Sequence, residues 1–128
     1  MRNEEFKEFK ERLQGFIDDY DPYLIEDAID ELKRKFECEC DFGETLRRSD
    51  IQSIVDEYDL CNQFQIEGFL RMYENYGYGT DEKLTETQEE IIQDMVCSVL
   101  DYRDYYTEFS QLVENVSGGK CQGYEFLE

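Results

Sequence analysis

The sequence predicts a mainly α-helical protein, and three observations lead to that prediction. Apolar residues recur at alternating spacings of three and four along most of the chain. Helix-start signals, such as Thr85 with Gln88 three residues later, precede several of these apolar stripes. With 128 residues, 40% of them hydrophobic, the chain has enough apolar side chains for one core. We therefore expect a single acidic domain over residues 1–128, a bundle of about five helices.

The first two predicted helices lie in the N-terminal third of the chain. The first runs from Asn3 to about Asp18 and carries its apolar residues on one face. Asp21 followed by Pro22 marks a second start, because aspartate caps a helix and proline fits its first turn. The second helix is expected to end near Phe36, and the short link favours an antiparallel pair.

The period of the pattern changes after Phe36. Apolar residues alternate with acidic residues up to Phe42, which is typical of a half-buried strand. Residues 120–127, in which Tyr124 and Phe126 lie two apart, are a candidate partner strand. We therefore expect a small two-stranded β-ribbon that pairs residues 36–42 with 120–127 and is supported by a helix.

Two shorter helices are predicted in the middle of the chain. Ser49 with Gln52 begins a helix that runs to Tyr58. After a break around residues 59–62, a fourth helix extends to just before Gly77, and residues 78–81 form a loop. This pair has the outline of a helix-turn-helix, but its second helix carries Arg71 as the only base. A DNA reader needs several basic or amide side chains there, so we interpret the pair as a helical hairpin.

One long helix is predicted for the C-terminal third. It begins at Thr85 and ends before Gly118 and Gly119. Between them runs an apolar stripe of Gln88, Ile92, Met95, Val99, Tyr102, Tyr106, Phe109, Val113 and Val116.

The acidic charge of the chain limits its partners. The net charge is −20, from 33 acidic and 13 basic residues. Residues 49–128 hold 18 acids and 4 bases, and residues 1–48 hold 15 acids and 9 bases. Such a field repels nucleic acid and anionic membranes and attracts basic surfaces. We therefore expect no direct nucleic-acid binding and no membrane association.

No residue pattern points to an enzyme. Histidine, the commonest general base and metal ligand, does not occur in the sequence. The glutamates in Glu4-Glu5-x-x-Glu8 have the spacing by which some all-helical nucleotide pyrophosphatases hold Mg²⁺, but the Glu-x-x-Asp that follows in that family is missing. Similar pairs at 27–31 and 86–90 are expected by chance among 33 acids. We expect no catalysis, no cofactor and no metal, with a carboxylate-metal hydrolase as the weaker alternative.

The five cysteines fit neither a disulfide framework nor a zinc site. Their number is odd, the spacing within Cys38-x-Cys40 is narrower than zinc sites favour, and their positions follow the apolar pattern. Together with the lack of a signal-peptide-like run near the N-terminus, this favours a cytoplasmic setting in the cytosol of a host cell. The other cysteines are Cys61, Cys97 and Cys121.

Acidic and tyrosine residues together form the candidate site. On the predicted long helix the acids fall off the apolar stripe, one turn (about 5–6 Å) or two turns (about 10 Å) apart, which brackets the phosphate spacing along a nucleic-acid strand. Tyrosines among them add flat contact area and a hydroxyl. The candidate residues are Glu86, Glu90, Asp94, Asp101, Tyr102, Asp104, Tyr105 and Glu108, with Asp56, Glu57 and Asp59 as a second patch.

In size, charge and aromatic content the chain resembles the small acidic inhibitors made by phages and mobile elements, the anti-CRISPR and anti-restriction proteins. No family motif matches, so no residue role is transferred. The resemblance implies a non-enzymatic DNA mimic that binds the basic nucleic-acid channel of a Cas effector or another defence nuclease. The alternative is a helical adaptor that dimerises or binds a partner through its long amphipathic helix. Monomer and homodimer both remain open.

Overall fold

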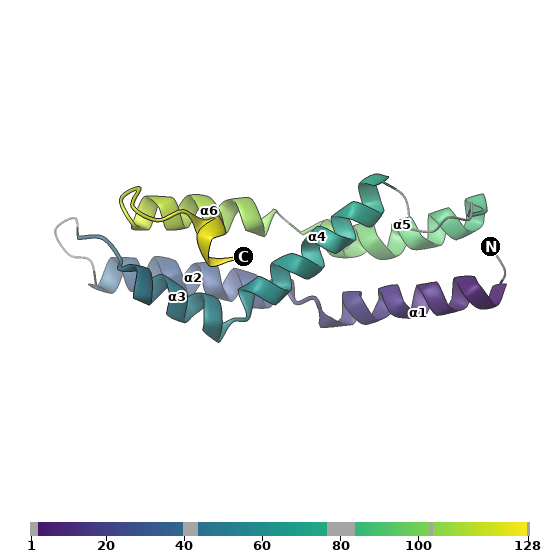
Figure 1. Ribbon diagram of the computed structural model, residues 1–128, viewed down its shortest axis with the longest axis horizontal. Coiled ribbons are helices and arrows are strands. Elements are labelled where there is room, and N and C mark those ends of the chain that lie inside the picture. The colour runs from purple at the N-terminus through teal and green to yellow at the C-terminus, as the bar shows by residue number, and fades with distance from the viewer. Residues whose placement is uncertain (1–2, 40–43, 77–83, 103, 128) are drawn as a thin grey trace. The chain divides into compact units, whose positions relative to one another are not determined.

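A computed structural model describes residues 3–39, 44–76, 84–102 and 104–127 of the protein. All regular elements in these ranges are helical, which confirms the predicted mainly α fold (Figure 1). None of these helices is both long and apolar enough to cross a bilayer. The elements are α1 (Asn3–Asp19), α2 (Pro22–Glu39), α3 (Arg48–Glu57), α4 (Leu60–Tyr76), α5 (Glu86–Leu100), α6 (Tyr105–Val116) and the 3₁₀-helix η2 (Gly123–Phe126).

The helices form two compact units. Unit 1 comprises Met1–Tyr20 and Gln65–Arg103, and so contains α1, most of α4 and α5. Unit 2 comprises Asp21–Phe64 and Asp104–Glu128, and contains α2, α3, the first residues of α4, α6 and η2. The single domain expected from the sequence stays a prediction, because compact units of this size occur both within one domain and as separate domains.

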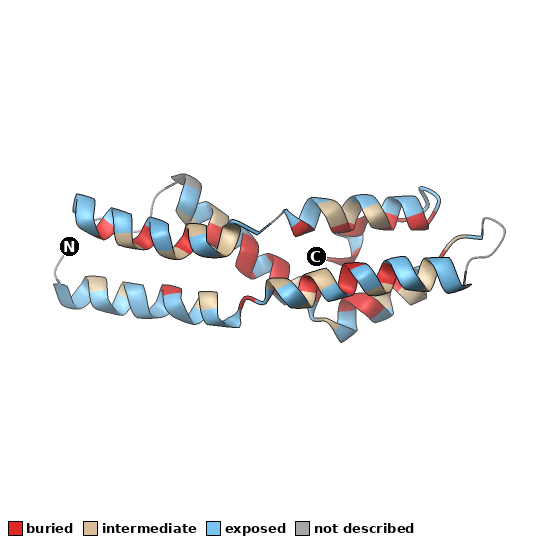
Figure 2. Cartoon of the chain, turned by 180° about the vertical axis from the view of Figure 1, so that it is seen from behind, coloured by how far each residue is buried: buried red, intermediate tan, exposed pale blue. Residues whose placement is uncertain are grey.

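Unit 1 is held together by the inner faces of its three helices. Helix α1 packs along α5, and the aromatic rings of α1 meet those of α4. The ring centroids of Phe16 and Phe69 lie 4.5 Å apart, and those of Phe9 and Tyr73 lie 5.5 Å apart. The buried apolar residues of this core are Leu13, Tyr20, Ile66, Leu70, Leu84, Ile92 and Val96. Figure 2 shows buried bands that alternate with intermediate and exposed residues along the helices.

A charged pair lies inside the core of unit 1. Glu67 on α4 is only 2% exposed, and one of its carboxylate oxygens lies 2.7 Å from the Arg71 guanidinium one turn later. The Tyr20 hydroxyl donates to the other oxygen at 3.4 Å. The Tyr20 hydrogen bond joins the residue that follows α1 to α4. The buried Glu67 carboxylate that accepts it is stable only with its partners in place.

Unit 2 is built around Phe109 of α6. Its ring is fully buried, and the centroid of the Phe64 ring lies 6.0 Å away. Helix α2 packs against both α3 and α6. The start of α2 is capped by Asp21, whose carboxylate accepts from the backbone N–H groups of Tyr23 and Leu24 at 3.0 and 3.2 Å. Proline in the first turn and this cap confirm the predicted start signal.

The C-terminal segment is fastened to unit 2 from several sides. Arg48, in the first turn of α3, donates to the Glu125 carboxylate at 2.8 Å and lies 4.7 Å above the Phe126 ring. The Cys61 thiol donates to the carbonyl of Phe126 at 3.1 Å. Gly123 lies so close to Ser110 of α6 that a Cβ atom there would overlap the Ser110 Cα. The segment is therefore part of the fold.

Two glycine-to-alanine variants are expected to have opposite effects on stability. Gly123→Ala should lower the free energy of unfolding by about 1–3 kcal/mol, because the new methyl group overlaps the α6 backbone. Gly15→Ala, within α1, meets no atom within 4 Å and should raise stability by about 0.5–1 kcal/mol. Urea unfolding followed by circular dichroism measures both. Equal effects of the two substitutions would contradict the close packing of η2 on α6.

The helix limits agree with the sequence in most places. Helix α1 ends one residue beyond the predicted Asp18, and α4 ends before Gly77. Gln88 and Thr85 form the predicted capping box, with the Gln88 N–H donating to the Thr85 hydroxyl at 3.2 Å and the Thr85 N–H to the Gln88 side chain at 3.0 Å. After α6, Gly118 and Gly119 adopt φ of 66° and 80°, as the predicted stop requires. Residues 78–81, the predicted loop, lie outside the described ranges.

The prediction of one long helix from Thr85 to Val116 is wrong. Helix α5 ends at Leu100, and α6 begins at Tyr105. Asp104 causes the new start, because its carboxylate accepts from the Thr107 N–H at 3.3 Å and from the Thr107 hydroxyl at 3.1 Å. The break changes which residues face inward, so that Tyr102 and Tyr106, expected in the apolar stripe, are 43% and 39% exposed.

The predicted β-ribbon is also wrong where the structure describes it. Residues 36–39 continue α2, and half of the expected partner strand, Gly123–Phe126, forms the 3₁₀-helix η2. Residues 40–42 lie outside the described ranges. Cys38, expected on a buried strand face, is exposed on α2. The N-cap of α3 is Arg47, two residues before the predicted Ser49, and its N–H donates to the Asp50 carboxylate at 3.2 Å.

Candidate partner-binding surface

Four predicted site residues form one line on α5. We define Glu86, Glu90, Asp94 and Asp101 as the acidic stripe, and all four are exposed. At about 100° per residue, their positions fall within an arc of about 80°. The buried residues of α5, Gln88, Ile92 and Val96, lie on the opposite side of the helix. The acidic stripe therefore faces away from the core of unit 1.

The spacing of the acidic stripe has a definite length and charge density. At about 1.5 Å per residue it extends over about 22 Å, with successive charges about 6 Å apart over its first three residues. One strand of B-DNA carries a phosphate every 3.4 Å of helix axis, so the stripe has roughly half that linear charge density. A groove that spaces its cations along a polynucleotide strand therefore meets fewer but regularly spaced anions here.

Glu74 of α4 adds a fifth carboxylate beside the acidic stripe. The Cys97 thiol, on the same side of α5, lies 3.7 Å from the Glu74 carboxylate, to which it donates. Burial raises the pKa of Cys97, and the charges of Glu74, Asp101 and Asp94 raise it further. The thiol therefore stays protonated at neutral pH. Sequence reasoning missed Glu74, because only the packing of α4 on α5 brings it to this place.

The other residues predicted around the break in the long helix are divided between the two units. Tyr102 is exposed in unit 1, but Asp104, Tyr105 and Glu108 belong to unit 2. Tyr105 is only 3% exposed, so its assignment to a binding surface is wrong; it contributes to the core. Asp104 caps α6, and the half-buried Glu108 lies 3.9 Å from the ammonium of Lys33.

The second predicted patch lies at the C-terminal end of α3 in unit 2. Asp56, Glu57 and Asp59 are all exposed there, and the last turn of α3 carries no base. Carboxylates at this end oppose the helix dipole, which costs about 0.3–1 kcal/mol for each charge at low salt. Asp59 also adopts a left-handed φ of 51°. Asp56 is nevertheless held on α3 by the Gln52 side-chain amide, which donates to its carboxylate at 2.9 Å.

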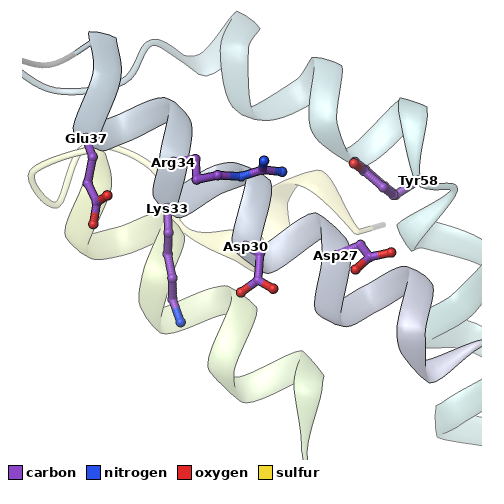
Figure 3. A pocket seen from close by; sticks show the side chains of 6 residues that line it. All are labelled: Asp27, Asp30, Lys33, Arg34, Glu37 and Tyr58. Atoms are coloured by element: carbon purple, nitrogen blue, oxygen red, sulfur yellow. The ribbon is translucent and has the colours of Figure 1, made fainter.

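A shallow hollow on unit 2 has a mixed charge that sequence reasoning did not find. It has a volume of about 700 Å³, and the side chains of Arg34 and Tyr58 point toward one another across it (Figure 3). The only sequence signal for the hollow is that four of its residues on α2 are spaced by three, four and three, as on one face of a helix. These are Asp27, Asp30, Arg34 and Glu37. The hollow is lined by Asp27, Asp30, Lys33, Arg34, Glu37 and Tyr58.

Tyr58 at the edge of this hollow has an unusual titration. Its hydroxyl donates to the Glu31 carboxylate, and that hydrogen bond, with burial and the charge of Glu31, raises the pKa of Tyr58 to about 12. Because the raised pKa favours the neutral phenol, its stabilising contribution is complete below pH 10 and is lost as the pH rises to about 12. We expect Tyr58→Phe to remove a component that titrates near pH 12 from the tyrosinate absorbance of the protein. If the absorbance difference between the wild type and Tyr58→Phe instead titrated near pH 10, the raised pKa of Tyr58 would be contradicted.

Comparisons with protein-family models, with curated proteins and with solved structures found no match to this chain. Within the described ranges, no three Asp, Glu or Cys side chains are gathered in a way that could hold a metal ion. The geometry of the surface is therefore the basis for any functional proposal.

Proposed function

We propose that this protein is a non-enzymatic inhibitor that presents an acidic surface to the basic nucleic-acid channel of a partner protein. The partner class is a Cas effector or another defence nuclease, in which arginines and lysines normally grip phosphates. The acidic stripe of α5 carries the proposal: four exposed carboxylates stand in line, on the side of the helix that faces away from the core. Tyr102, exposed beyond the end of α5, adds aromatic contact area in the same unit.

The cost of the acidic stripe to the fold supports a functional origin. Glu86 with Glu90, and Glu90 with Asp94, are like-charged pairs one turn apart, and each pair costs about 0.2–0.5 kcal/mol in a helix. A net charge of −20 also exceeds the magnitude of about 2–8 that solubility asks of a small domain. Only Glu86, in the first turn of α5, favours the helix dipole, so the remaining charge of the acidic stripe is explained by a cationic partner.

Carboxylates can replace phosphates in such a channel because arginine binds both through paired hydrogen bonds. The surrounding negative field would accelerate association, and added salt would weaken it. A protein that occupies the channel in this way competes with nucleic acid and does not need to bind nucleic acid itself. We therefore expect inhibition by exclusion, without any chemical change in the nuclease.

An order-of-addition assay tests the proposal. Purified defence nucleases are mixed with the protein either before or after their DNA or guide RNA, and cleavage is followed in time. We expect strong inhibition when the protein is added first and little when the channel is already filled. Inhibition that is independent of the order, or no inhibition of any nuclease, contradicts the proposal.

The adaptor alternative required one continuous amphipathic helix, and α5 and α6 are separate helices in different units. Their apolar faces are used within their own units. Sedimentation equilibrium at low and high salt checks this alternative. The proposed inhibitor can act as a monomer, whereas an adaptor of this kind predicts a self-associated species that persists at high salt.

A further inference from the structure

The acidic stripe alone cannot select one position on a partner. Glu86, Glu90 and Asp94 are evenly spaced by about 6 Å, so a shift by one turn restores two of the three charge pairs. A row of like charges also attracts any basic groove. Specificity needs a feature that penalises the wrong partner or the wrong register, as a charge of the opposite sign does.

The hollow on α2 and α3 provides that feature. It combines three carboxylates with two cations, in a protein whose acids outnumber its bases 33 to 13. Lys33 and Lys35, on either side of Arg34, lie 3.9 Å from Glu108 and Asp50. Arg34 is exposed and forms no ion pair with any residue in the described ranges. No ion pair within the described ranges therefore competes with an incoming group for the charge of Arg34.

We propose that this hollow is the specificity contact of the inhibitor and that it accepts a neighbouring carboxylate and cation on the surface of the partner protein. This rests on the proposed function. Arg34 binds the partner's carboxylate, and Asp27 and Asp30, seven and four residues before it on the same face, bind the partner's lysine or arginine. Tyr58 forms the opposite wall and is held in place by its hydrogen bond to Glu31. Because a cation and two carboxylates follow one another in a fixed order, only one alignment of the partner's charges matches them. A uniform row of acids allows several alignments.

Nucleic acid is not the ligand of this hollow. Three carboxylates line it, and a phosphate strand would approach them together with the two cations. A protein surface that carries both signs avoids this repulsion, and Tyr and Arg are enriched at the centres of protein interfaces.

Reversing the charge of Arg34 distinguishes this proposal from attraction by net charge. Arg34→Glu makes the chain more acidic, from −20 to −22, so a purely field-driven inhibitor should bind equally well or more tightly. We expect instead that its affinity for an inhibited nuclease, measured by titration of cleavage, falls by about tenfold or more. Arg34→Gln, which adds no negative charge to α2, should lose affinity to a smaller extent, and circular dichroism shows that both variants are folded.

Arg12→Glu is the matched control. It makes the same change in net charge at an exposed position of α1 in unit 1, and its affinity should equal or slightly exceed that of the wild type. If Arg34→Glu behaves like Arg12→Glu, the hollow is not a specificity contact, although the proposed function stands. If the wild-type protein inhibits no nuclease, the proposed function fails and this inference fails with it.

Discussion

Reversal of three charges in the acidic stripe is expected to weaken inhibition by about a hundredfold. The variant combines Glu90→Lys, Asp94→Lys and Asp101→Lys. Each substitution replaces an attraction to the partner's cations by a repulsion, and about 0.9 kcal/mol for each site gives two decades. Titration of nuclease cleavage measures the loss directly. Most of it should appear as a slower association rate at low salt, because steering by charge acts on the encounter.

The structure decides which residues this variant should include. Asp104 is unsuitable because its carboxylate caps α6, so its reversal would also destabilise unit 2. Glu86 lies in the first turn of α5, where a lysine opposes the helix dipole. Asp101 lies at the other end of α5, where a lysine is favourable.

A matched control changes three acids of α1. Glu8, Glu11 and Asp18 are exposed in the same unit, and Asp18 lies near the end of its helix as Asp101 does. Both triple variants bring the net charge from −20 to −14. The control is expected to lose only the small part of affinity that depends on net charge. Equal losses in the two variants would mean that the position of the charges on α5 is irrelevant.

Removal of Arg71 is expected to have the largest effect on stability. Arg71→Met keeps the apolar part of the side chain but removes the guanidinium that lies 2.7 Å from the Glu67 carboxylate, which is 2% exposed. Breaking a buried pair in this way costs about 3–5 kcal/mol in the free energy of unfolding. Glu67→Leu should cost less, because the Arg71 side chain that remains is 37% exposed and can be hydrated. Chemical unfolding monitored by circular dichroism ranks the two variants.

The double variant Glu67→Leu with Arg71→Met distinguishes the effect of the uncompensated Glu67 charge from the effect of changing the two side chains. With both charges removed, most of the loss should be recovered, because apolar residues of similar volume replace buried pairs well. A double variant as unstable as Arg71→Met alone would show that the charge of Glu67 is not the cause.

Local signals in the sequence were sufficient for most helices. The capping box of Thr85 and the Asp21-Pro22 start depend on residues within one turn, so they are visible without the fold. The break after Leu100 is not predicted, because the apolar stripe runs across it and indicates one continuous helix. The opposing signal was local too: Asp104, three residues before Thr107, is a capping pattern inside the stripe. The periodicity of the apolar stripe was therefore given more weight than the helix-start signal at Asp104.

The β-ribbon failed for a different reason. Residues 36–39, the first four of the alternating run that ends at Phe42, form the last turn of α2, and alternation over a single turn fits the end of a helix as well as a strand. The C-terminal partner is shaped by tertiary contacts, namely Arg48 with Glu125 and Gly123 against Ser110, which connect residues far apart in the sequence. No local pattern could reveal them.

The acidic stripe could be found from spacing, and its surroundings could not. Acids one turn apart on a helix necessarily share a face, which is why Glu86, Glu90 and Asp94 were identified together. The neighbouring Glu74 comes from α4, and the hollow around Arg34 combines α2 with Tyr58, which follows α3. Tyr105 was assigned to the surface because a continuous helix was assumed. Since α6 starts anew after the break, the Tyr105 side chain instead packs in the core of unit 2.

Mutual exclusion at equilibrium tests the mimicry of nucleic acid most directly. A nuclease that the protein inhibits is mixed with labelled nucleic acid and with the differently labelled protein, and the sedimenting species are resolved. If the acidic stripe occupies the nucleic-acid channel, two binary complexes form and exchange as either ligand is titrated, and no ternary complex is present. A stable ternary complex that contains nuclease, nucleic acid and this protein would contradict the proposal.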